Sequence, residues 1–364
     1  HLNYIQDEIY VTIMLSRIVS DLEFGMIDYE QKLAKPKSLV PAKQFDKKII
    51  FTTDKELRSQ FINFGPKDSI YQGVAKGLIA FIDAHKIDSN TFEIKSIKYD
   101  SIDALPKTKA ALISKGYLSK DTNDSLVIAE ALCRFQKDNS LKPDAVIGKY
   151  TSMALNESTA HKIERIMVSM DKLRARELPR GKYIRINIPE YTLRFYINDS
   201  LKSEHNIVVG KQENQTPELN SKLRKIVVYP YWNVPYSISS KEILPAVKRN
   251  VSYLEKHHYL LYKNNEVVDP YTVDWSKIRE NSFPYKVVQQ PGRHNSLGIL
   301  KFDFHNTHSV YFHDTPSKGL FGADVRAYSH GCMRTQNPVD LAKAVLERDE
   351  YNDKWNEMIP DSLD

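Results

Sequence analysis

Hydrophobic residues recur at helical spacing through most of the first half of the chain. Two apolar stripes in residues 1–25 follow this spacing and end at Gly25, which we expect to be a helix C-cap. The same spacing recurs in residues 71–84, 107–115 and 158–178. It predicts a helical scaffold domain at residues 1–104, a compact helical unit at 105–157 and a connecting helix at 158–180.

The period of the hydrophobic residues changes to two at Tyr183, which is typical of β-strands. Alternating segments predict strands at residues 183–188, 191–197, 201–209, 223–229, 298–304 and 309–312. Residues 237–288 interrupt the alternation with a predicted helix at 241–256, followed by charged and polar loops. Because functional lids are drawn from such loop-rich segments, we expect this insertion to act as a lid. The chain is therefore predicted to be an α+β multidomain protein, with a β-rich domain at 181–350 and a tail at 351–364.

Composition and charge exclude several classes of protein. Hydrophobic residues form 41% of the chain and aromatic residues 10%, which suffices for packed cores and argues against general disorder. The net charge of +6 comes without long polybasic tracts, so nucleic acid is not an expected partner. A run of about 18 apolar residues is missing, so we expect no transmembrane segment in this chain. Because the chain begins at His1 without an initiator Met or a basic signal region, we expect a trimmed or mature form.

The chain has two cysteines in unlike surroundings. Cys133 lies on the apolar stripe of a predicted helix, where a thiol usually behaves as a small buried hydrophobic group. Cys332 follows Gly331 in a short polar loop, and this glycine permits a substrate to approach the backbone closely. Cys332 is therefore the candidate for chemistry.

A histidine lies where it can serve Cys332 as a base. On the predicted strand that leads to His313, the phenol of Tyr311 and the imidazole point to one face. A Cys and a His on adjacent elements form a nucleophile and general base pair. His330 and Arg334 flank the thiol, and we expect them to favour its thiolate form. These residue types alone also fit a purely structural role.

Further groups near this pair can support acyl transfer. The backbone N–H groups of Gly331 and Cys332 are candidate oxyanion donors, and Tyr311 could add its hydroxyl. Asp314, through its backbone or its side chain, could orient the imidazole.

Zinc binding is a less favoured alternative for this region. His305, His308 and His313 have a spacing that zinc sites use. The first two are expected to flank a hairpin turn in solvent, and His313 is better used by Cys332. We therefore expect no metal and no cofactor.

Two phrases in the helical unit resemble the helical peptidoglycan-binding domain family. They are Glu-Ala-Leu-Cys-Arg-Phe-Gln at residues 130–136 and Asp-Ala-Val-Ile-Gly-Lys-Tyr-Thr at residues 144–151. In that family Gly usually stands at the position of Ala145, and Pro at the position of Lys149. The resemblance implies that residues 105–157 dock on the glycan peptide of a cell wall.

The segment around Cys332 resembles the signature of the YkuD-type L,D-transpeptidase catalytic domain. His313 is followed by fifteen residues and then by Ser329-His330-Gly331-Cys332-x-Arg334. Further phrases resemble the large YcbB-type branch of that family, namely Trp232–Pro235, Lys241–Pro245, Gln290–Gly292, Asn295–Gly298 and His313–Lys318. Ser296 stands where that family often has Ala. The resemblance implies a helical scaffold, a wall-binding domain and a catalytic domain with a capping insertion at 237–288.

The same resemblance implies a reaction and assigns roles to residues. The thiol of Cys332 would attack the bond between the third and fourth residues of a peptidoglycan tetrapeptide stem, with His313 as the general base. An amine of a second stem would then take the acyl group from the thioester, which forms a 3–3 crosslink. The implied oxyanion and supporting residues are Gly331, Tyr311, Ser329, His330 and Asp314, and the implied substrate contacts are Arg334, Asn295 and Trp232. Acylation by carbapenem-type inhibitors is also implied, as is a periplasmic place in the cell envelope with the signal or anchor removed.

Three other outcomes stay open from the sequence. Water could resolve the thioester, which would make the protein an L,D-carboxypeptidase, and the capping insertion would decide by admitting or excluding water. The protein could instead be a non-catalytic wall-binding scaffold. A third variant would attach a lysine of another protein to the wall.

Overall fold

The computed structural model describes residues 65–100, 102–174 and 179–346, together with residues 13–14, 18, 21, 25–28, 33–34 and 62–63. These belong to two compact units, His1–Leu178 and Pro179–Asp364. Most of the helix predicted at 1–25, and the whole tail predicted at 351–364, lie outside the described residues. In the described part of the chain, no helix has both the length and the apolar character needed to cross a membrane.

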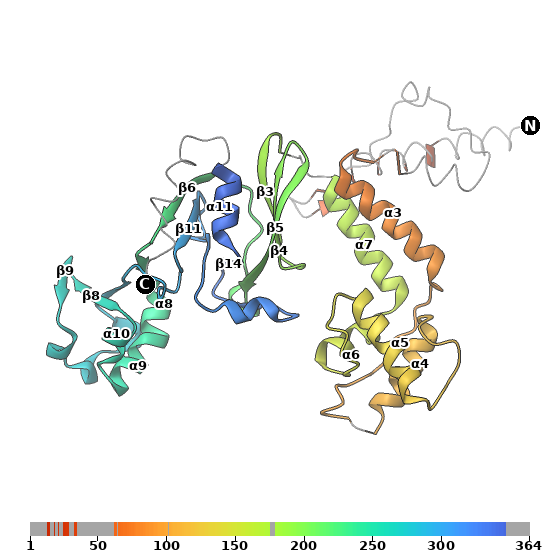
Figure 1. Cartoon of the computed structure of the whole chain (residues 1–364), viewed down its shortest axis with the longest axis horizontal. Helices are drawn as coiled ribbons and strands as arrows, with labels where there is room; N and C mark the ends of the chain where they lie inside the picture. The colour runs from red at the N-terminus through yellow and green to blue at the C-terminus, as the bar shows by residue number, and fades with distance from the viewer. Residues whose placement is uncertain are drawn as a thin grey trace, which may run out of the picture. The chain divides into compact units, whose positions relative to one another are not determined.

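Two long helices pack side by side in the first unit (Figure 1). These are α3, Ser69–Ala84, and α7, Thr159–Arg174, which confirm the helices predicted at 71–84 and, as far as residue 174, at 158–178. The Asp68 carboxylate caps α3 by accepting hydrogen bonds from the Ile70 and Tyr71 N–H groups. Tyr71 is buried, and its hydroxyl accepts a hydrogen bond from the Arg174 guanidinium at 2.7 Å. Two short strands, β1 (Ile27–Asp28) and β2 (Leu33–Ala34), pair elsewhere in this unit.

Three shorter helices form a second core in the same unit. They are α4 (Ala104–Ser114), α5 (Ser125–Asp138) and α6 (Lys149–Asn156), and their core contains Ile94, Ala104, Ala111, Leu112, Leu118, Ala131, Leu132, Phe135, Ile147 and Leu155. The buried Gln136 amide holds the connection to α6 by donating to Asp144 and to the Val146 carbonyl. Ala145 in this connection has a φ of +55°, a region that favours the glycine usual in the family it resembles. Cys133 is a free, half-buried thiol, so its expected burial is only partial.

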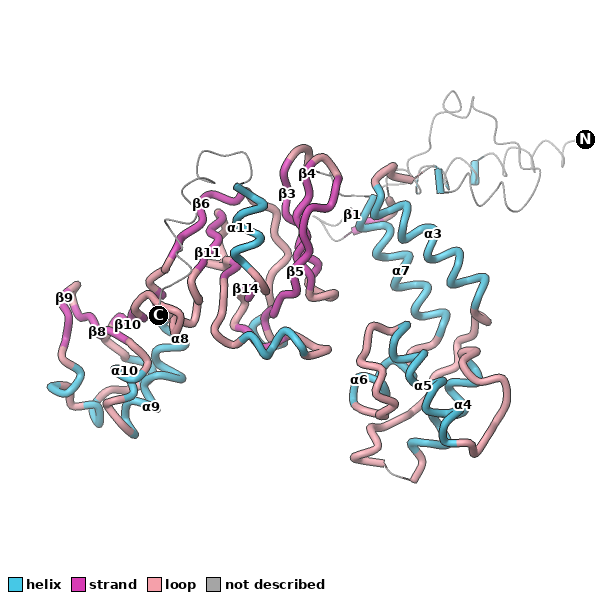
Figure 2. Tube along the Cα trace, viewed as in Figure 1, coloured by secondary structure: helices cyan, strands magenta, loops and turns pink. Residues whose placement is uncertain are grey.

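An eight-stranded sheet forms the centre of the second unit (Figure 2). Its order is β3 (Lys182–Asn187), β4 (Thr192–Ile197), β5 (Ser200–Gly210), β14 (Met333–Thr335), β12 (Phe312–His313), β11 (Leu300–Phe304) and β6 (Leu223–Val228), with β13 (Ala327–Ser329) paired to β5. Neighbours are antiparallel, except that β12 pairs with β14, and β13 with β5, in parallel. The strands predicted before residue 230 are confirmed. The strand predicted at 309–312 is shorter, because Ser309 has a φ of +55° and cannot continue an extended strand.

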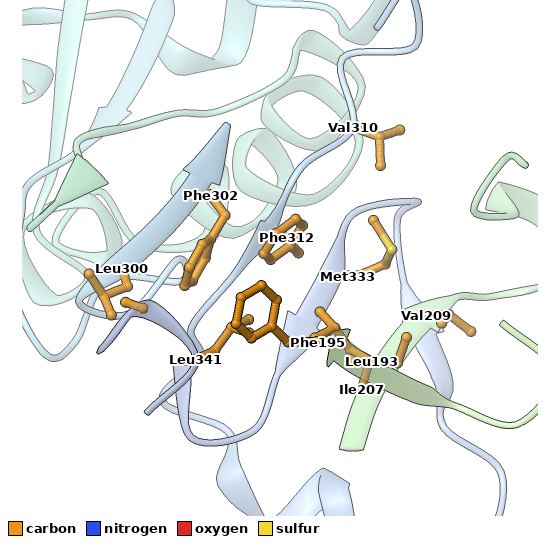
Figure 3. Packing of buried hydrophobic residues seen from close by; sticks show 11 residues of the cluster. Leu193, Phe195, Ile207, Val209, Leu300, Phe302, Val310, Phe312, Met333 and Leu341 are labelled. Carbon is orange, nitrogen blue, oxygen red and sulfur yellow. The ribbon is translucent and has the colours of Figure 1, made fainter. Parts of the chain in front are cut away.

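The sheet is anchored by a cluster of buried apolar side chains. Figure 3 shows Phe302 of β11 beside Phe312 of β12, and their rings stack with centroids 4.6 Å apart. Leu341 of α11 (Pro338–Leu346) is fully buried in the same cluster. The cluster comprises Leu193, Phe195, Ile207, Val209, Leu300, Phe302, Val310, Phe312, Met333, Leu341 and Ala342. It therefore fixes β12 and β14, the two strands that adjoin the predicted catalytic residues.

The capping insertion folds around a core of its own, which includes the buried Trp275 and Phe283. A four-stranded sheet has the order β7 (Trp232–Asn233), β10 (Lys286–Gln289), β8 (Tyr259–Lys263) and β9 (Glu266–Val268). The helix predicted at 241–256 is instead a series of short pieces, α8 (Tyr236–Ile238), a π-helical turn (Ser239–Ile243), α9 (Leu244–Arg249) and α10 (Tyr253–Lys256). Asn250 separates α9 from α10 because its backbone is extended.

The prediction that the rest of the capping insertion consists of loops was partly wrong. β8 and β9 are joined by Asn264 and Asn265, whose φ values of +51° and +67° suit a tight hairpin turn that Asn tolerates. Single 3-10 turns occupy Pro270–Thr272, Trp275–Lys277 and Glu280–Ser282, and others lie at Gln212–Asn214 and Lys318–Gly322. The insertion is therefore a small folded subdomain.

Candidate active site

Cys332 and His313 are brought to one place by the parallel pair β12 and β14. His313 ends β12 and pairs with Arg334, while Cys332 immediately precedes β14. One step back in this register, the Met333 N–H donates to the Tyr311 carbonyl at 3.1 Å, so Cys332 lies alongside Tyr311. Tyr311 and His313 share a face because side chains alternate along a strand, and their rings meet edge to face at 5.6 Å.

The loop before Cys332 is shaped by Ser329. This buried hydroxyl donates to the Cys332 carbonyl and accepts a hydrogen bond from the Gly331 N–H at 3.2 Å. Gly331 has a φ of +113°, and its carbonyl accepts from the Thr216 hydroxyl at 2.8 Å. In this structure the Gly331 N–H, which the sequence suggests as an oxyanion donor, is directed to Ser329. The Cys332 N–H remains the backbone candidate, since no partner for it occurs among the described residues.

His313 is held as a neutral base. Its side chain is buried, and its Nδ1 atom contacts the Asp314 carbonyl, which assigns the proton to Nδ1 and leaves Nε2 as an acceptor. Burial lowers the pKa of His313 to about 4, against a smaller opposing effect of that carbonyl. At neutral pH the imidazole is therefore uncharged and able to accept a proton.

Asp314 positions the imidazole through its backbone, which is one of the two routes that the sequence left open. Its carboxylate is used elsewhere, because it accepts a hydrogen bond from the Ile299 N–H at 3.0 Å and pairs with Lys318. Gly298 makes room for this carboxylate. Gly298 has a φ of +59°, and a Cβ added at this position would lie 2.3 Å from Asp314 Oδ2.

The thiol of Cys332 is protonated at rest. Burial raises its pKa, while hydrogen bonds from the Tyr311 N–H and hydroxyl and the charge of Lys301 lower it by less. The expected stabilisation of the thiolate by its neighbours in the sequence is thus outweighed by desolvation. A thiolate at Cys332 would therefore form only if a base took this proton.

His330 and Arg334, the two residues predicted to favour the thiolate, have different surroundings. His330 is turned toward the capping insertion, where its Nε2 atom lies 2.8 Å from Glu242 Oε1. Arg334 is half-buried, and burial lowers its pKa. Within the described residues the Arg334 guanidinium has no ion-pair partner, so it can bind an anionic group beside His313.

Tyr311 connects the thiol to the capping insertion. Burial raises the pKa of Tyr311, the neighbouring Cys332 raises it further, and Trp232 lowers it by less. Trp232 belongs to β7, the edge strand of the capping sheet. The phenol therefore stays protonated and can donate a hydrogen bond at the reaction centre.

The side chain of Asn295, a predicted substrate contact, is buried and hydrogen-bonded to the surrounding backbone. It is 0% exposed, and its amide donates to the Pro230 and Gln290 carbonyls at 3.1 and 2.8 Å. Its side-chain oxygen accepts from the Leu297 N–H at 2.8 Å. Because no polar atom of its side chain is left over, Asn295 ties the loop between the two sheets and does not face a substrate.

The remaining histidines do not form a metal site with His313. His305 and His308 are exposed in the turn between β11 and β12, as the sequence predicts. Across the described residues, no group of three His, Cys, Asp or Glu side chains is arranged to hold a metal ion.

Sequence reasoning missed three residues near the thiol. Thr216 holds the Gly331 carbonyl, Glu242 holds His330, and Lys301 lies over the Tyr311 ring. A signal existed only for Lys301, because the alternation of the strand at 298–304 places it on the polar face, opposite the apolar Phe302.

Two comparisons with known proteins concern the second unit. The family model of the YkuD L,D-transpeptidase catalytic domain matches residues 181–352. A relative from Haemophilus influenzae, named "Putative L,D-transpeptidase", is 39% identical over 163 residues. That match covers 44% of this chain, and the chain spans about a third (33%) of the length of this relative. Residues 181–352, most of the second unit, therefore match the L,D-transpeptidase catalytic domain of the YkuD family.

Proposed function

We propose that the protein is a cysteine L,D-transpeptidase that crosslinks peptidoglycan stems. The observation that carries the proposal is the parallel pairing of β12 with β14, which sets His313 beside the loop of Cys332. The match of residues 181–352 to the L,D-transpeptidase domain supports it. The donor would be a tetrapeptide stem and the acceptor a second stem.

The first half of the reaction forms a thioester. Nε2 of His313 takes the proton of the Cys332 thiol as Sγ attacks the carbonyl carbon of the third stem residue. The oxygen of the tetrahedral intermediate becomes negative, and the Cys332 N–H and the Tyr311 hydroxyl stabilise it. When the C–N bond breaks, the imidazolium of His313 returns its proton to the leaving amine, and the fourth residue departs.

The second half transfers the acyl group. A side-chain amine of the acceptor stem attacks the thioester carbonyl and loses a proton to His313. The C–S bond then breaks, an amide remains, and the thiolate recovers the proton from the imidazolium. The thiol proton leaves with the fourth residue and is replaced by a proton from the acceptor amine, so the enzyme is regenerated and no further reactant is consumed.

Two further residues are proposed to contact the substrate. Arg334 offers a half-buried guanidinium beside His313, which suits the terminal carboxylate of the donor stem. Trp232 lies in the capping sheet and acts on the pKa of Tyr311, so it can help the insertion to enclose the stem. Enclosure would exclude water from the thioester and favour an amine acceptor over hydrolysis.

The other parts of the chain are assigned by the same proposal. The α4–α6 unit, with the two phrases that resemble the peptidoglycan-binding family, would dock on the wall. The site of action would be the cell envelope, in the periplasm. Because carbapenems present a strained carbonyl to a nucleophile, we also propose that they acylate Cys332.

The test is incubation of the full chain with a disaccharide tetrapeptide, followed by mass spectrometry of the products. The expected product is a dimer that lacks one terminal residue, and Cys332→Ala should give none. A tripeptide monomer alone, formed at high acceptor concentration, would identify an L,D-carboxypeptidase. Unchanged substrate, with no carbapenem adduct on Cys332, would contradict both activities and favour a wall-binding scaffold.

A further inference from the structure

A lysine that the sequence reasoning did not select lies at the centre of the proposed active site. Lys301 is on β11, and its Cα pairs with that of His313 on β12. Its side chain is only 22% exposed, and its Nζ atom lies 4.1 Å from the centroid of the Tyr311 ring. This is a close cation–π contact with the residue whose hydroxyl meets the thiol.

The charge of Lys301 is controlled by one carboxylate. Its Nζ atom is 3.3 Å from Asp303 Oδ1, two residues along the same strand. Asp303 also pairs with Lys225 of β6 at 3.6 Å, and the Lys225 side chain is 65% exposed. Lys301 and Lys225 therefore share a counter-ion, but Lys301 alone contacts the catalytic tyrosine.

We propose that Lys301 is an electrostatic positioning residue, which holds the Tyr311 ring against Cys332 and stabilises negative charge on the sulfur. The role rests on the proposed function, because that function makes Cys332 the nucleophile. A partly buried cation acts more strongly than an exposed one, since water screens it less. The contact with the ring face also restricts the phenol to the orientation that its hydrogen bond requires.

The charge acts on both reacting groups in a useful direction. Lys301 lowers the pKa of the Cys332 thiol, which eases deprotonation. Lys301 and Arg334 both lower the pKa of His313, so the imidazolium formed in the reaction is a stronger acid toward the leaving amine. Asp314 acts on the pKa of His313 in the opposite direction.

The experiment measures alkylation of Cys332 by iodoacetamide as a function of pH. It uses the full chain with Cys133→Ser, because Cys133 is also a free thiol. Loss of the cation in Lys301→Met should move the alkylation profile to higher pH and slow alkylation at pH 7 by roughly 3- to 10-fold. Asp303→Asn removes the counter-ion and should move the profile to lower pH.

Two further variants separate charge from packing. Lys301→Arg keeps the cation and should restore the profile of the parent protein. Lys225→Met removes the exposed lysine from the same carboxylate and should leave the profile in place. An unchanged profile in Lys301→Met, or an equal shift in Lys225→Met, would overturn the proposal. Since alkylation needs no peptidoglycan, a shifted profile would stand even if the crosslinking assay failed.

Discussion

The Nε2 atom of His330 lies 2.8 Å from the Oε1 atom of Glu242, and this contact joins the loop of the nucleophile to the capping insertion. Glu242 belongs to the π-helical turn at Ser239–Ile243. Trp232 of the capping sheet acts on the pKa of Tyr311, so this sheet also lies close to the surroundings of Cys332. Movement of the insertion is therefore coupled to the surroundings of the thiol.

Glu242→Gln should loosen this attachment and raise the share of hydrolysed product. Both side chains are exposed, at 36% and 54%, so the pair contributes only about 0.2–1 kcal/mol. We expect the ratio of tripeptide to dimer to rise by roughly 2- to 5-fold, with little change in thermal stability. Mass spectrometry of the products measures this ratio. Glu255→Gln, on α10 of the same insertion, is the control, and an equal effect there would refute a role for the His330 contact.

The stability of the second unit should fall in acid because of His313. Its pKa is about 4 in the folded chain and about 6.5 when unfolded, so the unfolded state binds more protons between these values. The stabilisation is fully present above pH 6.5 and is lost as the pH falls toward 4, by on the order of 3 kcal/mol. Chemical unfolding at a series of pH values should show that the free energy of unfolding depends less steeply on pH in His313→Asn than in the parent protein. The exposed His308→Asn should keep the slope of the parent protein.

Gly298→Ala should disturb the catalytic base from a distance. The added Cβ would lie 2.3 Å from Asp314 Oδ2, and the φ of +59° costs a residue with a side chain about 1–2 kcal/mol. We expect a lower melting temperature and at least a tenfold loss of the rate at which a carbapenem acylates Cys332. Gly319→Ala is the matched control, because nothing lies within 4 Å of its built Cβ. Similar losses in both variants would exclude the proposed contact as the cause.

Asn295→Ala should lower stability more than it lowers substrate affinity. The substitution leaves the Pro230 and Gln290 carbonyls and the Leu297 N–H without their partner, and each buried unsatisfied group costs about 1–3 kcal/mol. We expect the melting temperature to fall by several degrees, while KM of the remaining folded enzyme stays within about twofold. Asn281 is exposed, so Asn281→Ala is the control and should leave the melting temperature unchanged. A large rise in KM at unchanged stability would restore Asn295 as a substrate contact.

Much of the fold can be predicted from local sequence patterns, where the local preference and the tertiary packing favour the same structure. Asp124 and Asp68 cap α5 and α3 because short carboxylates satisfy free N–H groups at a helix start. The two-residue period of β4 and β5 survives because one face is buried in the main core. The capping sheet was not foreseen, because β9 has only three residues and β7 only two. Strands of that length exist through their pairing with β8 and β10 and leave little periodicity in the sequence.

In the candidate site too, some features can be predicted from the local sequence, and others depend on residues that are distant in the chain. Cys332 and His313 are visible in the sequence because their residue types and spacing are characteristic. The hydrogen bond of the Gly331 N–H could not be foreseen, because its acceptor is the side chain of Ser329 folded back onto the loop. Desolvation of Cys332 likewise depends on segments remote in the chain, and so the direction of its pKa shift appears only in three dimensions.

The parallel pairing of β12 with β14 has a consequence for how such a sequence can vary. The base and the nucleophile are held in register by the sheet, and the segment between them is a spacer that contains the turn at Lys318–Gly322. The same spacer also contains Asp314, β13 and Ser329, so an insertion or deletion would leave His313 and Cys332 in place only if it fell at that turn. One residue added within β12 would instead turn the imidazole to the opposite face of the sheet. Insertions and deletions in related sequences should therefore occur at the turn between the two strands and not within β12 or β14.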